Sequence, residues 1–267
     1  MSSYIIKHVK LVRTFLYLAW KQMLEYKFAF YTSFLRQLII MAIWIAFWRI
    51  IIGGMTSVQG WTFEALSVFV GYLLFLEGFW SIFFPVMRIG DTIRKGQIDV
   101  FLTKPMNPVF GLVLRRMYIS DTMGMLLGLG IISYVSINSG VETVALRLGL
   151  AVIMAMGATA ISVMVYAFVG LLTFWLGEVA FLRDALVSFD VADYYPTTVF
   201  PSLIQYFLTF VIPTIFFATY PALLTMQYTF PTIARIFALE ALIFVIWFAI
   251  LRTTYHFGVR RYESFGG

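Results

Sequence analysis

Long apolar runs recur along the chain and constrain its fold more than any other feature. A transmembrane helix needs about 20 consecutive residues that are mostly apolar. The run from Leu148 to Trp175 meets this requirement without a single charged residue. Together with five further runs it predicts an all-α integral membrane protein with six transmembrane helices, at about Phe28–Ile52, Phe63–Phe84, Val109–Tyr134, Leu148–Trp175, Thr197–Thr225 and Ile233–Leu251.

The composition supports a lipid environment and excludes several kinds of site. The 267 residues are 61% hydrophobic and 12% charged, whereas about 25% of the residues in a soluble domain are charged. The chain has no cysteine, which excludes disulfides and thiolate metal sites. His8 and His256 lie near opposite ends of the sequence, so we expect no metal site. No short apolar core precedes a small-residue cleavage site near the start, so we expect no cleavable signal peptide.

Lysine and arginine alternate between the connections of the predicted spans. Cytoplasmic connections carry an excess of these residues. They gather before the first span, between the second and third, and after the sixth, at positions that include Lys7, Lys10, Arg88, Arg94, Lys95, Arg260 and Arg261. We therefore expect both termini in the cytoplasm and the protein in the cytoplasmic (inner) membrane. Basic residues at that boundary favour anionic lipid, so the net charge of +6 requires no nucleic-acid partner.

Two segments are expected to lie on or partly inside the bilayer. Between Tyr4 and Tyr26, apolar residues recur every three or four positions with lysines between them, which predicts an amphipathic interfacial helix. Prolines interrupt the fifth apolar region, where they would kink one span or mark short helices that re-enter the membrane. The segment from Pro221 to Ile233 suits a re-entrant element before the last helix. The expected organisation is a cytoplasmic N-terminal segment (1–27), a transmembrane domain (28–251) with a cytoplasmic loop at 85–108, and a cytoplasmic tail (252–267).

The connection between the second and third spans, from Arg88 to Pro105, is longer than two adjacent helices require. Gly96 follows two basic residues, as expected where a short helix ends in a glycine. A second short helix, from Gln97 to Thr103, would be stopped by Pro105. These features predict a compact element at the membrane surface that docks on another protein.

The run Gly-Asp-Thr-Ile-Arg-Lys-Gly-Gln-Ile-Asp-Val-Phe-Leu-Thr-Lys-Pro, which ends at Pro105, resembles the cytoplasmic loop of ABC-2 type transporter permeases. It fits the pattern I-R-x-G-x-[IL]-D-x-x-L-x-[KR]-P of one branch, and the prolines of the fifth region fit the same branch. The resemblance implies the membrane subunit of an ATP-driven transporter, an exporter, that works with a second permease chain as a homodimer or heterodimer. It also implies a separate ATPase subunit that binds ATP and Mg. The residues that it places at this ATPase are Asp91, Arg94, Gly96, Asp99, Leu102 and Pro105.

No G-x-x-x-x-G-K-[ST] phosphate loop occurs in the chain, so we do not expect it to bind ATP or to be an enzyme itself. Glu77 lies centrally in the second span, where it would line a translocation path or be satisfied by a neighbouring helix. Two other functions stay open. An ion-coupled secondary transporter would use Glu77 as its coupling group, and a membrane-embedded enzyme would use the aspartates Asp184, Asp190 and Asp193. Arg36 is expected to extend toward the membrane interface.

Overall fold

The computed structural model describes residues 27–97, 99–102 and 122–262, together with Arg13, Thr14, Tyr17, Leu18, Lys21 and Glu25. Within these residues every named element is a helix, as the sequence predicts. A helix pairs its backbone N–H and C=O groups within itself, and this is needed in a membrane because lipid offers them no hydrogen-bond partners. Most of the expected amphipathic helix, Tyr4–Tyr26, lies outside the described residues.

Four helical stretches are long and apolar enough to cross a membrane. They contain α2 (Lys27–Ile52), α3 (Phe63–Phe83), α8 (Val144–Leu171) and α13 (Phe230–Arg261). A fifth candidate is a helix pair with a sharp bend, and α7 (Met123–Asn138) is shorter. The predicted third span began at Val109, and its first part lies outside the described residues.

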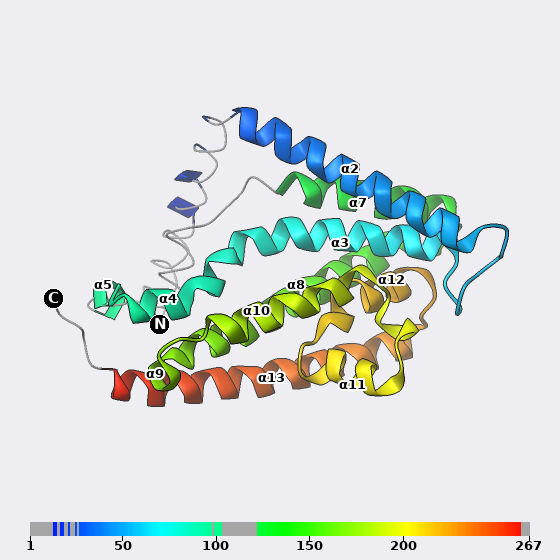
Figure 1. Cartoon of the computed structure of the whole chain (residues 1–267). Coiled ribbons are helices and arrows are strands. Elements are labelled where there is room, and N and C mark those ends of the chain that lie inside the picture. Colours follow the sequence, from blue (N-terminus) through cyan, green and yellow to red (C-terminus); the bar gives the residue numbers. More distant parts are fainter. Residues whose placement is uncertain are drawn as a thin grey trace.

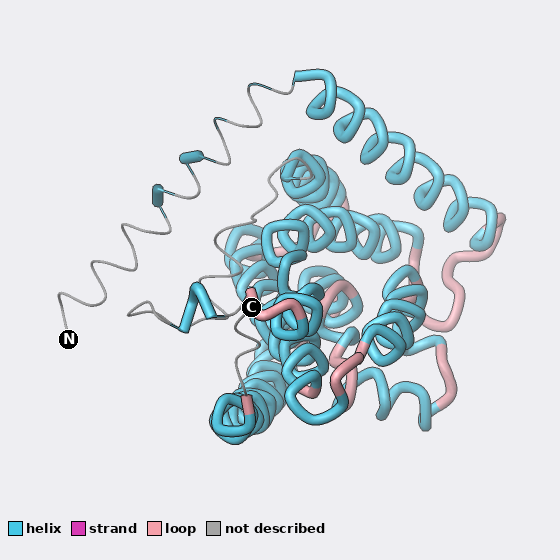
Figure 2. Tube along the Cα trace, turned by 60° about the vertical axis from the view of Figure 1, so that its left-hand side comes forward, coloured by secondary structure: helices cyan, strands magenta, loops and turns pink. Residues whose placement is uncertain are grey.

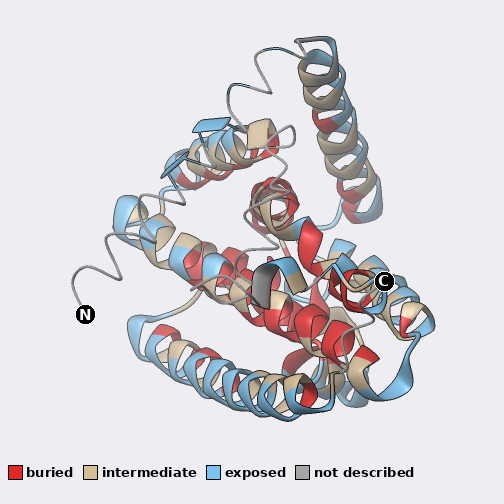
Figure 3. Ribbon diagram, turned by 90° about the vertical axis from the view of Figure 1, so that its left-hand side faces the viewer, coloured by how far each residue is buried: buried red, intermediate tan, exposed pale blue. Residues whose placement is uncertain are grey.

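The helix α3 occupies the middle of the bundle (Figure 1), where it contacts α2 and α7 as well as α8 and α12 (Thr219–Met226). Thr62 caps its first turn by accepting a hydrogen bond from the backbone N–H of Ala65. Glycines allow a close approach to α7, since a Cβ on Gly71 would lie 2.5 Å from Ile132 Cγ1. Buried residues concentrate at the centre of the bundle, as Figure 3 shows.

The helix α2 lies at the edge of the bundle, and only 17% of its apolar window is buried inside the protein. Figure 2 shows it set apart from the other helices. Its exposed large side chains include Phe28, Tyr31, Leu35, Ile39 and Ile43. Such a surface suits lipid rather than water.

The two ends of the bundle are defined by different elements. One, the α4 end, holds the helix α4 (Ile89–Arg94), and the other, the α12 end, holds α12 and the helix α11 (Ser202–Phe210) (Figure 1). The chain travels between them after α8. Glu178 lies 3.4 Å from Arg94 at the α4 end, and Thr198 accepts a 2.9 Å hydrogen bond from the Trp61 indole at the α12 end.

The fifth apolar region contains a sharp bend, and it begins and ends at the α12 end. Its helices, α11 and the pair formed by η5 (Thr214–Phe216) and α12, meet at a bend of 81°. It starts beside Trp61, and it ends where Gln227 donates a hydrogen bond to the Gly60 carbonyl. Such a bent pair fits either a broken span or a re-entrant loop, so the crossing expected at Thr197–Thr225 stays a prediction.

The passage from the α4 end to the α12 end is made by α10 (Ala180–Phe189), η3 (Asp190–Tyr194) and η4 (Thr197–Val199). Hydropathy does not reveal it because it contains three aspartates. The bent region from Ser202 to Met226, which we call the re-entrant element, begins well before the predicted Pro221–Ile233 segment.

Candidate functional site

The connection after α3 begins with a change of helix type. Pro85 lacks a backbone N–H, and the chain continues as the 3-10 helix η1 (Phe84–Arg88) before α4 begins. The last turn of α4 ends at Gly96, whose φ is +67°. The backbone N–H of Gly96 bonds to the Ile93 carbonyl, and that of Gln97 bonds to the Thr92 carbonyl. This is the Schellman arrangement, so the predicted glycine cap is confirmed.

The helix α4 packs tightly on α8. Ile89 and Ile93 are buried in a cluster with Tyr166, Ala167 and Leu171. Glycines bring the two backbones together, because a Cβ on Gly170 would lie 2.9 Å from Ile89 Cβ and 3.2 Å from the Gly90 nitrogen. A displacement of α4 therefore has to move α8 as well.

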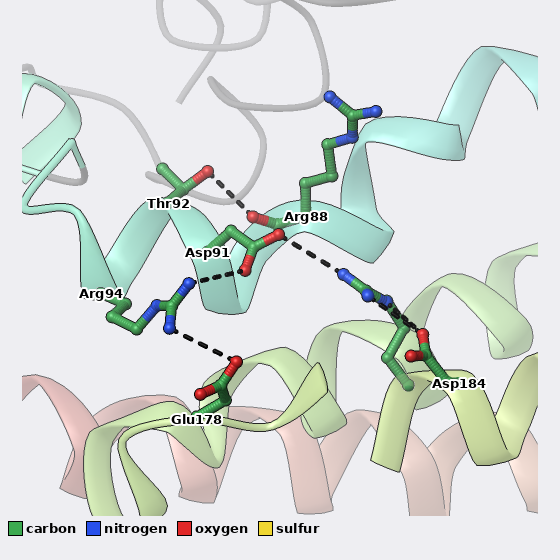
Figure 4. A network of polar contacts seen from close by, with 7 residues as sticks. Arg88, Asp91, Thr92, Arg94, Glu178 and Asp184 are labelled. Atoms are coloured by element: carbon green, nitrogen blue, oxygen red, sulfur yellow. Dashed lines mark hydrogen bonds and ion pairs between the residues drawn. The ribbon is translucent and has the colours of Figure 1, made fainter. Parts of the chain in front are cut away.

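A chain of charges joins α4 to the polypeptide that follows α8 (Figure 4). Asp91 lies 3.4 Å from Arg183 on α10 and 3.9 Å from Arg94. Arg94 lies 3.4 Å from Glu178, and Arg183 lies 3.0 Å from Asp184. The ion pairs thus connect the loop after the second predicted span to the passage between the two ends.

The second short helix of the loop is α5 (Asp99–Leu102), inside the predicted Gln97–Thr103. Asp99 opens this helix. Burial and the nearby Asp99 carboxylate raise the pKa of Tyr262, which follows α13, to about 12. The loop therefore also approaches the end of the last helix. The Leu102 side chain and Pro105 lie outside the described residues.

The six residues predicted to face an ATPase do not share one role in this geometry. Asp91 and Arg94 form ion pairs within the chain, and Gly96 ends α4. Lys95, Gln97 and Val100 are exposed at the tip of the loop, beside the exposed side chain of Arg94. Sequence reasoning gave these three no role.

Glu77 forms an ion pair with Arg36 at 3.1 Å, so Arg36 pairs with a neighbouring helix where an extension toward the interface was expected. The Glu77 side chain also lines a cavity of about 160 Å³ that lies between α2, α3, α8 and the segments around η3 and η5. Asp190 and Asp193 line the same cavity. The structure thus brings Glu77 together with two aspartates that lie far from it in the sequence.

A model of the ABC-2 family transporter proteins matches residues 12–266. The match covers almost the whole chain. This protein belongs to the ABC-2 transporter family. The resemblance based on the loop that ends at Pro105 is confirmed. No curated protein matches the sequence.

Members of the ABC-2 family are membrane components of transporters and are not themselves catalytic. Among the described residues of this ABC-2 protein, no group of three His, Cys, Asp or Glu side chains is arranged to hold a metal ion. Sequence analysis missed Glu178 and Arg183. Each of these two residues pairs with a residue of opposite charge in the loop, Glu178 with Arg94 and Arg183 with Asp91. Acidic and basic residues in both segments are the sequence signal that could have indicated this pairing.

Proposed function

We propose that this chain is the permease subunit of an ATP-driven ABC-2 exporter that a separate ATPase subunit drives from the α4 end. The observation that carries the proposal is the folded loop of α4 and α5, which packs on α8 and is joined by ion pairs to α10. A movement of this loop would therefore be transmitted to α8 and α10. Family membership supports an ATPase partner.

The tip of the loop is the surface that we assign to the ATPase. Lys95, Gln97 and Val100 are exposed there. Asp91 and Arg94 would act behind this surface, since they hold α4 in place. In this arrangement the ATPase binds ATP and Mg, and a second permease chain completes the transporter as a homodimer or heterodimer.

The proposed topology has six crossings of the inner membrane, with the α4 end and both termini in the cytoplasm. Basic residues support this orientation, because Arg88, Arg94 and Lys95 lie at the α4 end together with Arg260 and Arg261. The fifth crossing would be residues 178–198.

Cysteine labelling tests this topology directly, since the natural chain contains no cysteine. A membrane-impermeant maleimide is added to intact cells that make single-cysteine variants. We expect labelling of Glu142→Cys and Leu203→Cys in intact cells. Gln97→Cys and Glu178→Cys should react only after the membrane is opened. Labelling of Glu178→Cys from outside would contradict a crossing between 178 and 198.

Coupling is tested by purification of the tagged chain from its native membranes in mild detergent. We expect a phosphate-loop ATPase in stoichiometric amount and ATP hydrolysis by the purified complex. Asp99→Arg places a positive charge at the start of α5 and should remove most of the bound ATPase. The control Glu142→Arg makes the same change at the other end and should retain it. The proposal fails if the natural chain purifies without an ATPase, or if Asp99→Arg retains the natural amount.

A further inference from the structure

The cavity beside Glu77 has the dimensions of a site for a small organic molecule. Its volume is about 160 Å³, and a protein cavity of about 150 Å³ holds benzene. The walls come from five parts of the chain: α2, α3, α8, η3 and the region of η5. The cavity therefore lies where any relative movement of these segments would reshape it.

Two carboxylates in the cavity wall have no cationic partner among the described residues. The hydroxyl of Tyr166 donates to both oxygens of Asp190, at 3.0 and 3.1 Å. Asp193 Oδ1 is buried, and no hydrogen bond to a described residue satisfies it. Arg36 lies near these groups but forms its ion pair with Glu77. The cavity wall thus holds three carboxyl groups, and only that of Glu77 has a cationic partner among the described residues.

A buried hydroxyl in the same wall lies against Asp193. Thr214 is only 4% exposed and lines the cavity. Its hydroxyl interacts with the Asp193 side chain, but without ideal hydrogen-bond geometry. Buried polar groups are normally well paired, so this imperfect pair can also accept hydrogen bonds from a ligand in the cavity.

Aromatic rings form much of the remaining wall. Trp44 stacks on Tyr194 with ring centroids 5.1 Å apart and planes 3° apart. Trp80 lies against Tyr166 with centroids 5.3 Å apart. Faces of tryptophan and tyrosine attract cations, and their area also covers an apolar body. Carboxylates and ring faces together recognise an ammonium group on a hydrophobic molecule.

We propose that this cavity binds a small organic ammonium cation, with its N–H groups on Asp193, Asp190 and Thr214 and its apolar body between Trp44 and Trp80. The inference rests on the proposed function, because it makes this cation the class of substrate that the transporter carries. Glu77, which is paired with Arg36, lines one side of the site, and the two aspartates are left to bind the ligand.

Radiolabelled benzylammonium is a suitable probe, because it combines a benzene ring with an amine that is charged at about pH 7. Equilibrium binding is measured on the full complex with its ATPase, in nanodiscs of phosphatidylcholine, with empty nanodiscs as the blank. We expect saturable binding that benzyl alcohol, the neutral analogue, inhibits at least about tenfold more weakly. Benzoate, the anionic analogue, should not compete.

Substitutions locate the probe. Asp193→Asn keeps the size of the side chain and should weaken binding at least about tenfold, while Thr214→Val should weaken it about threefold. Glu142→Gln removes an exposed carboxylate far from the cavity and should leave binding unchanged. Affinities are compared only between variants whose melting temperature matches that of the natural protein. If Asp193→Asn is less stable, the Thr214→Val variant supplies the test.

Three outcomes would overturn the proposal: no saturable binding up to about 10 mM, equal competition by benzyl alcohol, or natural affinity in both cavity variants. Failure here is distinguishable from failure of the proposed function. A complex that hydrolyses ATP but does not bind benzylammonium leaves the coupling intact and removes only this substrate class. If the chain purifies without an ATPase, binding is measured on the chain alone in the same nanodiscs. Saturable binding by that chain removes the coupling and leaves the ligand class intact.

Discussion

The two ends of the bundle are held together by different kinds of contact. At the α12 end, Arg147 donates to the carbonyls of Leu224 at 2.9 Å and Tyr228 at 2.8 Å, and it lies 5.5 Å over the Phe230 ring. At the α4 end, the polar contacts are ion pairs between side chains such as Asp91, which is 39% exposed, and Arg183, which is 28% exposed.

The contacts at the α12 end resist exchange with water. The Thr219 hydroxyl accepts from the backbone N–H of Thr197 at 2.9 Å, and the Tyr72 and Thr225 hydroxyls bond at 2.9 Å, all of them buried. Loss of a buried partner leaves a polar group unsatisfied, at a cost of about 1–3 kcal/mol. The re-entrant element is thereby fixed to α3 and α8.

The contacts at the α4 end differ in that water and salt can replace the ion pairs. Exposed ion pairs contribute about 0–1 kcal/mol each. What does not exchange is the close fit of α4 on α8 through Gly90 and Gly170. The α12 end is therefore fixed by buried hydrogen bonds. At the α4 end the backbones of α4 and α8 are in rigid contact, while the ion pairs on the surface can rearrange.

The largest effect is expected at Gly170, where α4 packs on α8. Leu at this position would force Ile89 and the backbone of Gly90 away from α8, because a Cβ alone would already lie within 2.9 Å of Ile89. We expect Gly170→Leu to destabilise the protein by about 3 kcal/mol, which lowers the melting temperature by roughly 6–12 °C. Thermal unfolding of the detergent-solubilised complex measures this shift.

The matched control lies on the same helix. A Cβ on Gly149 would meet no atom within 4 Å, so Gly149→Leu should leave the melting temperature within about 1–2 °C of the natural protein. ATPase retention should fall only in Gly170→Leu. Equal effects of the two variants would show that the backbone contact with α4 has no special importance.

The anchor at the α12 end is tested by Arg147→Met, which keeps an apolar stem but removes the donors. Two carbonyls at the end of α12 then lose a charged partner, and we expect a loss of about 2 kcal/mol, or roughly 4–8 °C in melting temperature. Arg235→Met removes an exposed arginine near the same end and should change little. A small effect of Arg147→Met would mean that the re-entrant element is held mainly by its apolar contacts.

The sequence predicts the parts of this fold that local physics determines. Apolar length is enough to locate α2, α3, α8 and α13, since the cost of a polar backbone in lipid leaves helices as the solution. The positive φ of Gly96 requires glycine, so the end of α4 is visible from the residue type. The prolines likewise indicate that the fifth region is interrupted.

What the sequence could not show depends on partners far along the chain. Asp190 lowers the hydropathy of its segment, so hydropathy does not identify the passage through η3. In the structure the hydroxyl of Tyr166, 24 residues earlier, donates a hydrogen bond to Asp190. The same reason hid the pairing of Arg94 with Glu178. The aspartates considered for an enzyme were read as a local cluster, whereas Asp184 belongs to the ion pairs at α4 and Asp190 to the cavity.

The smallest expected effect concerns the ion pair between Asp91 and Arg183. A double-mutant cycle of Asp91→Asn and Arg183→Met should give an interaction energy below about 1 kcal/mol, because both side chains are partly exposed. Salt sharpens the contrast between the ends. A rise from about 0.1 to 1 M shortens the Debye length from about 10 to 3 Å, so this small term should shrink further while the cost of Arg147→Met changes less. An interaction energy above about 2 kcal/mol that salt does not reduce would contradict an exchangeable α4 end. The charges around Asp91 would then fix α4 as firmly as Arg147 fixes the re-entrant element, and a loop held so firmly could transmit force only by moving as one body with α8 and α10.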